Sequence, residues 1–307
     1  MPDVALWNKC NNHCVMCTNP FSFQLEDSLP YSSDNIKQRW GNVKIKKNDT
    51  IAFTGGEPTI HPDFLNLVIW FREKHPFNKI SIASNGRRFF YKNFTKQLLK
   101  INNLLIEIAI HGYDSKTHDA VTRATGSFEQ TINGLHNILK YKNSSQDVEI
   151  RIIITKLTYK HLDKIIEFLI KEFPIEEIRD IALIFMEFEG QAKDNINAVG
   201  ISYRQVNKYL TKLMNKPFIG ELNELRLYHF PLCVLPKSLW SFAWRTLRGE
   251  EVIFLPQCKN CIVKKYCLGI HRDYISYKGV KEFKPFTKKI KIKSNKSFYK
   301  PIDYSFY

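Results

Sequence analysis

The sequence predicts an α/β fold, a partial (β/α)6 barrel of the TIM type followed by a small irregular C-terminal domain. Short apolar runs alternate with helix-like runs over about 190 residues, as βα units do. The seven cysteines form two groups, one near each end of the chain, which indicates metal ligation. The 307 residues, 44% of them hydrophobic, are enough to bury a large core. An open doubly wound sheet gives the same alternation and remains the alternative fold.

Six runs have the near-continuous hydrophobicity of parallel strands that are covered on both faces. The predicted strands are Asp3–Trp7, Thr50–Phe53, Lys79–Ala83, Leu104–Ile110, Val148–Thr155 and Ile178–Glu187. The predicted helices between them are Pro62–Lys74, Lys92–Lys100, Ser127–Lys140 and His161–Glu172. In the third helix, Phe128, Ile132 and Leu135 recur at four- and three-residue spacing, which places them on one helical face.

Past residue 200 the pattern changes. We assign residues 1–200 to the barrel and residues 201–220 to a connection with one helix, Ser202–Met214. Residues 221–275 show little periodicity and carry the second cysteine group, so metal ligation is expected to staple this region. Residues 276–307 form a basic tail, in which nine lysines face one acid between Ser276 and Lys300, a local charge of +8.

The net charge of +16 suits nucleic acid, an acidic membrane face or an acidic peptide, without choosing among them. No run approaches the roughly 18–20 apolar residues of a membrane span. The start, Met1-Pro2-Asp3, lacks the basic and apolar regions of a signal peptide. An odd number of cysteines at short gaps argues for metal ligands over disulfides. We therefore expect a cytoplasmic protein with no membrane association.

The first cysteine group, Cys10-x3-Cys14-x2-Cys17, directly follows the first predicted strand. Three thiolates this close can bind three irons of a 4Fe–4S cubane and leave the fourth iron without a protein ligand. A structural zinc site needs four ligands, and His13 is awkwardly placed to supply the fourth. The spacing therefore favours a 4Fe–4S cluster, with zinc as the alternative.

With this triplet, the segment Thr54-Gly55-Gly56-Glu57-Pro58-Thr59 resembles the radical S-adenosylmethionine (radical SAM) enzymes. The resemblance implies that the backbone at Gly55 and Gly56 approaches the methionine part of S-adenosylmethionine, which residues without a Cβ allow. It also implies that Glu57 helps to hold the amino group of this cofactor. The cluster would cleave the cofactor reductively, and the resulting 5′-deoxyadenosyl radical would abstract hydrogen from a substrate.

Four further residues are candidates for cofactor binding. Ser84 and Asn85 end the third strand, where similar enzymes place polar groups toward the ribose, although Asn-Gly is also a turn signal. Met16 precedes the third cysteine, where many members of the family have an aromatic residue in the adenine pocket. A thioether can also pack on a purine. Glu187 ends the sixth strand, at the catalytic mouth of a barrel, with a solvated loop acid as the alternative.

The second group, Cys258-x2-Cys261-x5-Cys267, with Cys233 upstream as a fourth ligand, resembles the SPASM and twitch extensions of radical enzymes that modify peptides. Four cysteines suffice for a second, auxiliary 4Fe–4S cluster. Zinc held by the same four cysteines is equally good chemistry and stays open as the alternative. His271 is expected to be a partly exposed loop residue.

A narrower resemblance is to the HxsC-type radical maturases of the His-Xaa-Ser peptide system. It rests on His111-Gly112-Tyr113-Asp114, His118-Asp119, Gly126-Ser127-Phe128, Ala182–Gly190 and Phe230–Pro236. The resemblance implies a precursor peptide or small protein as substrate, a second radical SAM enzyme as partner and an external electron donor. The alternatives are a radical SAM enzyme acting on RNA, which the basic tail would suit, or on a small molecule, and a non-catalytic zinc protein.

Overall fold

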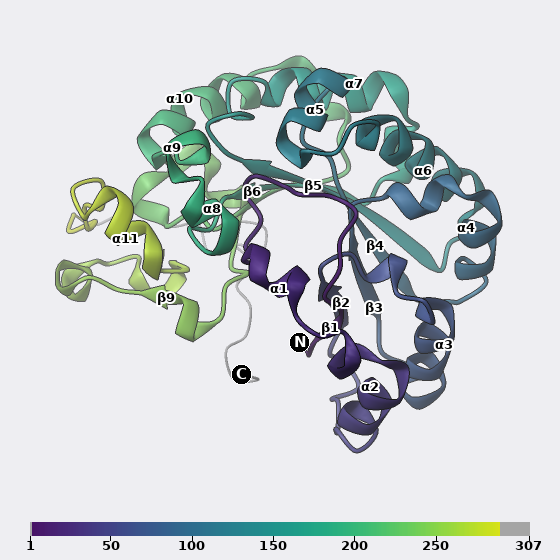
Figure 1. The fold of residues 1–307 in the computed structure, drawn as a ribbon. Coiled ribbons are helices and arrows are strands. Elements are labelled where there is room, and N and C mark those ends of the chain that lie inside the picture. Colours follow the sequence, from purple (N-terminus) through teal and green to yellow (C-terminus); the bar gives the residue numbers. More distant parts are fainter. Residues whose placement is uncertain (1, 289–307) are drawn as a thin grey trace.

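Eight strands form one parallel sheet in the order of the chain, β1 to β8 (Figure 1). The computed structural model describes residues 2–288. The strands are β1 (Asp3–Trp7), β2 (Ile51–Gly55), β3 (Ile80–Ser84), β4 (Leu104–Ala109), β5 (Gln146–Ile154), β6 (Asp180–Phe185), β7 (Leu225–Tyr228) and β8 (Ala243–Trp244). Each strand pairs in parallel with the next. This order is that of a partial TIM-type barrel and differs from a doubly wound sheet, whose strand order reverses.

The helices are α1 (Phe21–Leu25), α2 (Ser33–Trp40), α3 (Phe64–Lys74), α4 (Lys92–Leu98), α5 (Ser115–Thr122), α6 (Ser127–Tyr141), α7 (Leu162–Glu172), α8 (Gly190–Asp194), α9 (Ile196–Val199), α10 (Tyr203–Met214) and α11 (Arg272–Lys278). Helices α3, α4, α6, α7 and α10 lie along the outer side of the curved sheet, whereas α11 lies beside β9 (Val252–Ile253) (Figure 1). In α6, Ile132, Leu135 and Ile138 are buried, so the predicted apolar face is the one that packs on the sheet. None of the helices within residues 2–288 has the length and apolar character needed to cross a bilayer.

The predicted strands are β1 to β6, each within two residues at either end. The two further strands, β7 and β8, were not predicted, and they come from residues 221–275, which were expected to be irregular. At four and two residues they are too short to show a period of their own. They are strands because β6 offers a parallel edge to β7, which in turn pairs with β8. The sheet therefore continues past residue 200.

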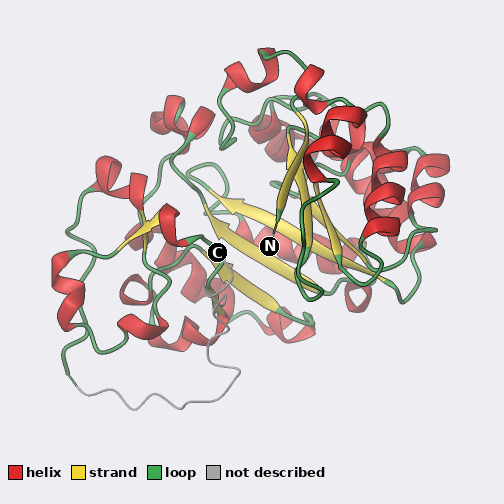
Figure 2. Cartoon of the chain, turned by 90° about the horizontal axis from the view of Figure 1, so that it is seen from below, coloured by secondary structure: helices red, strands yellow, loops and turns green. Residues whose placement is uncertain are grey.

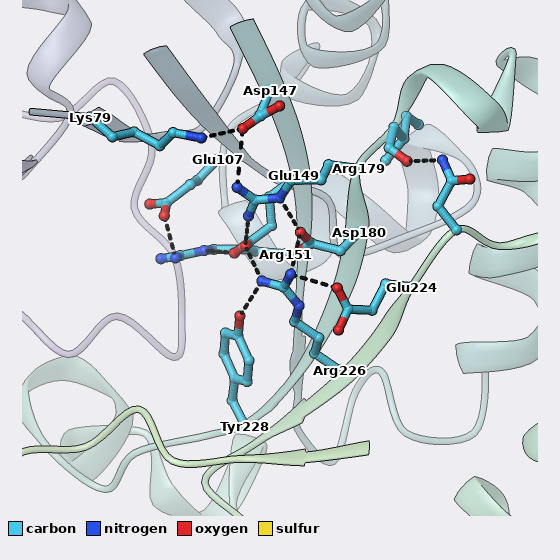
Figure 3. A network of polar contacts seen from close by, with 12 residues as sticks. Lys79, Glu107, Asp147, Glu149, Arg151, Arg179, Asp180, Glu224, Arg226 and Tyr228 are labelled. Carbon is cyan, nitrogen blue, oxygen red and sulfur yellow. Dashed lines mark hydrogen bonds and ion pairs between the residues drawn. The ribbon is translucent and has the colours of Figure 1, made fainter. Parts of the chain in front are cut away.

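A network of charged side chains lies on the concave side of β4 to β7, toward their amino-terminal ends (Figure 3). Side chains alternate along a strand, so Ile106 and Ile150 join the helix-covered core while Glu107 and Arg151 point the other way. Arg151 bridges two carboxylates, with Nη2 2.6 Å from Glu107 and Nε 2.6 Å from Glu149. The network continues through Lys79, Asp147, Arg179, Asp180, Glu224 and Arg226. It forms a charged layer below the carboxyl ends of the strands.

The region after β8 has little regular structure and lies beside the last strands of the sheet (Figure 2). Its one strand pair in the described residues is β9 (Val252–Ile253) with β10 (Ile270–His271), which run antiparallel. Short 3-10 turns make up most of the rest, up to α11. Of the predicted basic tail, residues 289–307 lie outside the described residues.

Candidate metal and cofactor site

The first three cysteines lie on the loop that leaves β1, close enough for their charges to affect one another's pKa. Burial, followed by the charge of Glu57, raises the pKa of Cys10 to about 12, and Cys17 contributes. Burial, followed by the charges of Cys10 and Cys17, raises the pKa of Cys14. Thiols in such a place give up their protons when a metal binds them, because the metal supplies the missing positive charge. Three converging sulfurs fit a 4Fe–4S cluster with one iron free of protein ligands.

The two glycines after β2 let this loop lie directly against the next strand. Gly56 N donates to Trp7 O at 2.7 Å, and Glu57 N donates to Lys9 O at 2.8 Å. A Cβ on Gly55 would stand 2.3 Å from Trp7 O, and one on Gly56 would stand 2.3 Å from Lys9 O. Gly55 also has φ of +117°, which L side chains rarely adopt. The absence of a Cβ is therefore required by the backbone that leads into the cysteine loop.

The carboxylate of Glu57 ties the ends of β2 and β3 together. The residue is 1% exposed, and its Oε1 accepts from Thr59 N at 3.1 Å and from Ser84 Oγ at 2.8 Å. Its Oε2 accepts from Asn85 N at 2.7 Å. Burial raises the pKa of Glu57, while these hydrogen bonds lower it. Because Glu57 in turn raises the pKa of Cys10, its charge faces the cysteine loop.

The segment after β3 contacts the same loop from the other side. Asn85 Nδ2 donates to Asn11 Oδ1 at 2.7 Å and lies 4.0 Å from the sulfur of Cys10. Arg87 Nη1 donates to Asn12 Oδ1 at 2.8 Å and also to the carbonyl of Asn11. The predicted polar residues at the end of the third strand therefore lie beside the first cysteine group. Arg87, which the sequence analysis did not single out, holds this loop in place.

The rest of the cysteine loop is held by elements far along the chain. Val15 N donates to Val121 O in α5 at 2.9 Å, and Ala192 N in α8 donates to Cys17 O at 3.1 Å. Met16, the predicted adenine-pocket residue, is 6% exposed and belongs to the main hydrophobic core. The loop thus bridges the first and the last parts of the barrel.

Glu187, the candidate after β6, lies beside two histidines. Its Oε1 is 3.6 Å from Nδ1 of His229, which follows β7 and has φ of +68°. Burial raises the pKa of Glu187 to about 7, and the nearby His271 opposes this shift. Burial lowers the pKa of His229 to about 4 and also lowers that of His271, so both rings are neutral near pH 7. Sequence reasoning missed His229 because β7, which positions it, is too short to be predicted.

The second cysteine group also converges. Cys233, Cys258, Cys261 and Cys267 line one cavity together with Val263, Phe283 and Pro285. Backbone amides point at the sulfurs, with Leu232 N 3.4 Å from Cys267 and Phe286 N 3.4 Å from Cys261. Burial, followed by the charges of Cys267 and Cys258, raises the pKa of Cys233 to about 12. The predicted fourth cysteine therefore does join the other three, and this donor set also fits a bound metal group.

The environment of His271 differs from the predicted one. His271 was expected to be a partly exposed loop residue, and this is wrong, because it is 3% exposed within β10. Its ligand atoms, those of Glu189 and those of Asp273 lie within 4.8 Å of one another, the one such group of three found among residues 2–288. Pairing with β9 and packing near the end of β6 bury the ring, which its sequence neighbours do not indicate.

Comparison with known proteins connects this arrangement to one family. The model described as "Radical SAM superfamily" matches residues 4–169. The Fe-coproporphyrin III synthase of Methanosarcina barkeri (strain Fusaro / DSM 804) is 25% identical over 198 residues, which cover 63% of this chain and 46% of the synthase. The mycofactocin maturase MftC of Mycobacterium tuberculosis (strain ATCC 25618 / H37Rv) is 28% identical over 155 residues, 50% of this chain and 38% of MftC.

Among solved structures, SuiB of Streptococcus suis bound to the precursor peptide SuiA has the same fold. The TM-score is 0.56 at 15% identity, over 73% of this chain and 48% of that chain. At this identity the likeness concerns the fold alone. The chain matches less than half the length of each of these three proteins.

Proposed function

Because the chain belongs to the radical SAM superfamily, we propose that it is a maturase that modifies a ribosomally made peptide or small protein. One observation carries this proposal. Cys233, Cys258, Cys261 and Cys267 of the C-terminal region line a single cavity. This cysteine pattern resembles the SPASM and twitch extensions of radical enzymes that modify peptides. Membership in the superfamily also argues against the alternative of a non-catalytic zinc protein.

The residues of the first site fit the family's cofactors. When bound, the 4Fe–4S cluster and S-adenosylmethionine supply one-electron chemistry that removes a hydrogen atom from an unactivated C–H bond. Cys10, Cys14 and Cys17 would hold three irons. Glu57 would accept from the amino group of S-adenosylmethionine. Within residues 2–288 its Oε2 accepts one hydrogen bond, from Asn85 N, so it retains acceptor capacity.

The other candidates would complete the cofactor site in different ways. Asn85 and Ser84 would turn polar groups toward the ribose of the cofactor. The side chain of Asn85 lies 4.0 Å from the sulfur of Cys10, and Ser84 donates to Glu57. Met16 would pack on the adenine from the core side. Glu187 lies after β6, at the carboxyl edge shared with the first site, and would contact cofactor or substrate.

At the second site we propose an auxiliary 4Fe–4S cluster, on the resemblance of its cysteine pattern to the SPASM and twitch extensions. Four thiolates suffice for such a cluster. Zinc held by the same four cysteines is the alternative, and metal analysis distinguishes the two.

The substrate class rests on resemblance. MftC is named a maturase, and the narrower resemblance to HxsC-type enzymes points to a peptide with His-Xaa-Ser motifs. A second radical SAM enzyme and an external electron donor are the partners that this resemblance implies, in the cytoplasm. A small-molecule substrate is one alternative, because an Fe-coproporphyrin III synthase is among the relatives. RNA is the other alternative substrate, because the net charge is +16.

The test uses the anaerobically reconstituted protein with S-adenosylmethionine and dithionite. A synthetic peptide with repeated His-Xaa-Ser motifs should increase the yield of 5′-deoxyadenosine and should itself change mass. The control peptide has the same length and charge, with Ser replaced by Ala. An increase with iron coproporphyrin or RNA, together with unchanged mass of both peptides, would replace the peptide proposal by that alternative. RNA binding would also weaken steeply with salt.

A further inference from the structure

A cluster of two acids and a histidine lies at the end of β6, and none of its three residues belongs to either cysteine group. Glu189 lies between β6 and α8, His271 in β10 and Asp273 in the first turn of α11. Three separate segments therefore bring their ligand atoms within 4.8 Å of one another. We propose that Glu189, His271 and Asp273 bind a divalent first-row transition metal ion that joins the barrel to the C-terminal region.

The imidazole of His271 is placed as a metal ligand would be. Its Nε2 is 3.7 Å from Oε1 of Glu189, which is too long for a hydrogen bond. Two ligands of one ion at bond lengths of about 2.0–2.2 Å stand roughly 3.0–3.5 Å apart, which is close to this separation. The side chain is 3% exposed, and neither ring nitrogen has a hydrogen bond in the described part of the chain. Nε2, which faces Glu189, is the nitrogen that would bind the ion. Buried polar side chains rarely stay unpaired unless a ligand or ion completes the site.

The two carboxylates also call for a cation between them. The carboxylate oxygens of Glu189 and Asp273 lie within 4.8 Å of each other, and two negative charges at this separation repel each other unless a cation lies between them. In a chain of net charge +16, this concentration of acids is a local exception.

Arg272 currently supplies the positive charge. Its Nη2 is 3.1 Å from Glu189, its Nε is 3.7 Å from Asp273, and its side chain is 50% exposed. An exposed arginine can turn into solvent at little cost, since surface ion pairs contribute little to stability. We therefore expect a bound ion to displace the guanidinium of Arg272 from the two carboxylates. A site with one histidine and two carboxylates suits Mn²⁺, Fe²⁺ or Zn²⁺.

The test is a titration of the holoprotein with Mn²⁺, followed by electron paramagnetic resonance of the free ion. Both cysteine sites are loaded with iron beforehand, so that Mn²⁺ does not enter them. The wild-type protein should bind about one Mn²⁺ per chain. His271→Ala and Asp273→Asn should each weaken binding at least about tenfold, as loss of one of three ligands does. Arg272→Met should strengthen binding, because it removes the competing charge.

A matched control is His136→Ala, since His136 pairs with Glu172 at 2.8 Å on the surface without a third ligand. It should bind Mn²⁺ as the wild type does. Wild-type binding without defined stoichiometry, or equal binding by the His271 and Asp273 variants, would overturn the metal site. If His271→Ala fails to load iron or to fold, the exposed Asp273→Asn decides alone. If Arg272→Met bound Mn²⁺ more weakly than the wild type, the idea that Arg272 competes with the ion would be wrong.

Discussion

The two cysteine sites differ in what holds them. The first lies on a loop of eight residues, Cys10 to Cys17, that backbone hydrogen bonds fix to α5 and α8. The second draws its ligands from Cys233 to Cys267, a stretch in which the described strands are two residues long. The strands and helices of the barrel around the first site pack on the main hydrophobic core, which also takes in Trp240, Val263 and Tyr274 of the C-terminal region. Around the second site regular structure is scarce, so we expect metal binding by the cysteines to stabilise this region.

This contrast separates two uses of a metal group. At the first site the fold positions the cysteines, and the proposed cluster would add chemistry. At the second site the proposed metal group would hold the fold together, because short turns without a ladder of hydrogen bonds become ordered at a high entropic cost. Removal of the two groups should therefore have opposite consequences for activity and for structure.

The largest effect is expected when Cys10, Cys14 and Cys17 are all changed to Ala. The variant should form no 5′-deoxyadenosine under dithionite, while its barrel stays folded because backbone contacts hold the loop. Iron should fall from about eight per chain to about four. Chromatography of the nucleoside and iron analysis measure both. Formation of 5′-deoxyadenosine at the wild-type rate would remove these cysteines from the mechanism.

Next, Cys258→Ala with Cys267→Ala should loosen the C-terminal region and spare the barrel. Iron should again fall to about four per chain, and protease cleavage should rise at least about tenfold within residues 221–288. Limited proteolysis under anaerobic conditions with mass spectrometry locates the cuts. A wild-type preparation that saturates at four irons would show that the second site holds no 4Fe–4S cluster.

A change in the charged layer of the barrel should cost stability without touching either metal site. Arg151→Met leaves Glu107 and Glu149 buried without their bridge, which typically costs about 3–5 kcal/mol. Burial raises the pKa of Glu107 to about 7, although Arg151 lowers it. Without Arg151 this folded-state pKa rises further above its unfolded value of about 4.3.

The sign of the pH dependence follows from proton binding. Between the two pKa values the folded variant binds more protons than the unfolded chain, so its stability falls as pH rises. The deficit of Arg151→Met against wild type should therefore be larger at pH 8 than at pH 6. Denaturant unfolding at both pH values measures it, and Lys171→Met, which breaks an exposed pair with Glu167, is the matched control. An equal deficit at both pH values would contradict the role given to Glu107.

The smallest effect is expected for Glu57→Gln, which keeps the shape and removes the charge. A charge-assisted hydrogen bond is worth ~1.5–3 kcal/mol, so affinity for S-adenosylmethionine should fall roughly ten- to hundredfold. Iron content should not change. Thr59→Val, which removes one donor to Glu57 and leaves its charge, is the control for structural loosening. Unchanged affinity in calorimetric titration at full iron loading would refute this role of Glu57.

Much of the barrel could be read from the sequence, because each of its first six strands carries its own apolar signal. The grouping of Cys10, Cys14 and Cys17 is equally local, since the spacing brings the three thiols together whatever surrounds them. Glu57, Ser84 and Asn85 could be placed near that loop because parallel strands end at one edge. What local patterns could not indicate is that Gly55 and Gly56 are required by the backbone at Trp7 and Lys9.

The sequence alone therefore determined the first six strands, the first cysteine group and the set of four later cysteines, whereas the order of the strands in the sheet came from the structure. The tertiary structure decided whatever depends on partners far along the chain. β7 and β8 are strands because β6 offers an edge, and Arg87 matters because its guanidinium meets the cysteine loop. His271 is buried beside Glu189, 82 residues earlier, because β10 packs near the end of β6. Such contacts leave no period in the sequence, since their energy is gained only when segments distant along the chain have already met.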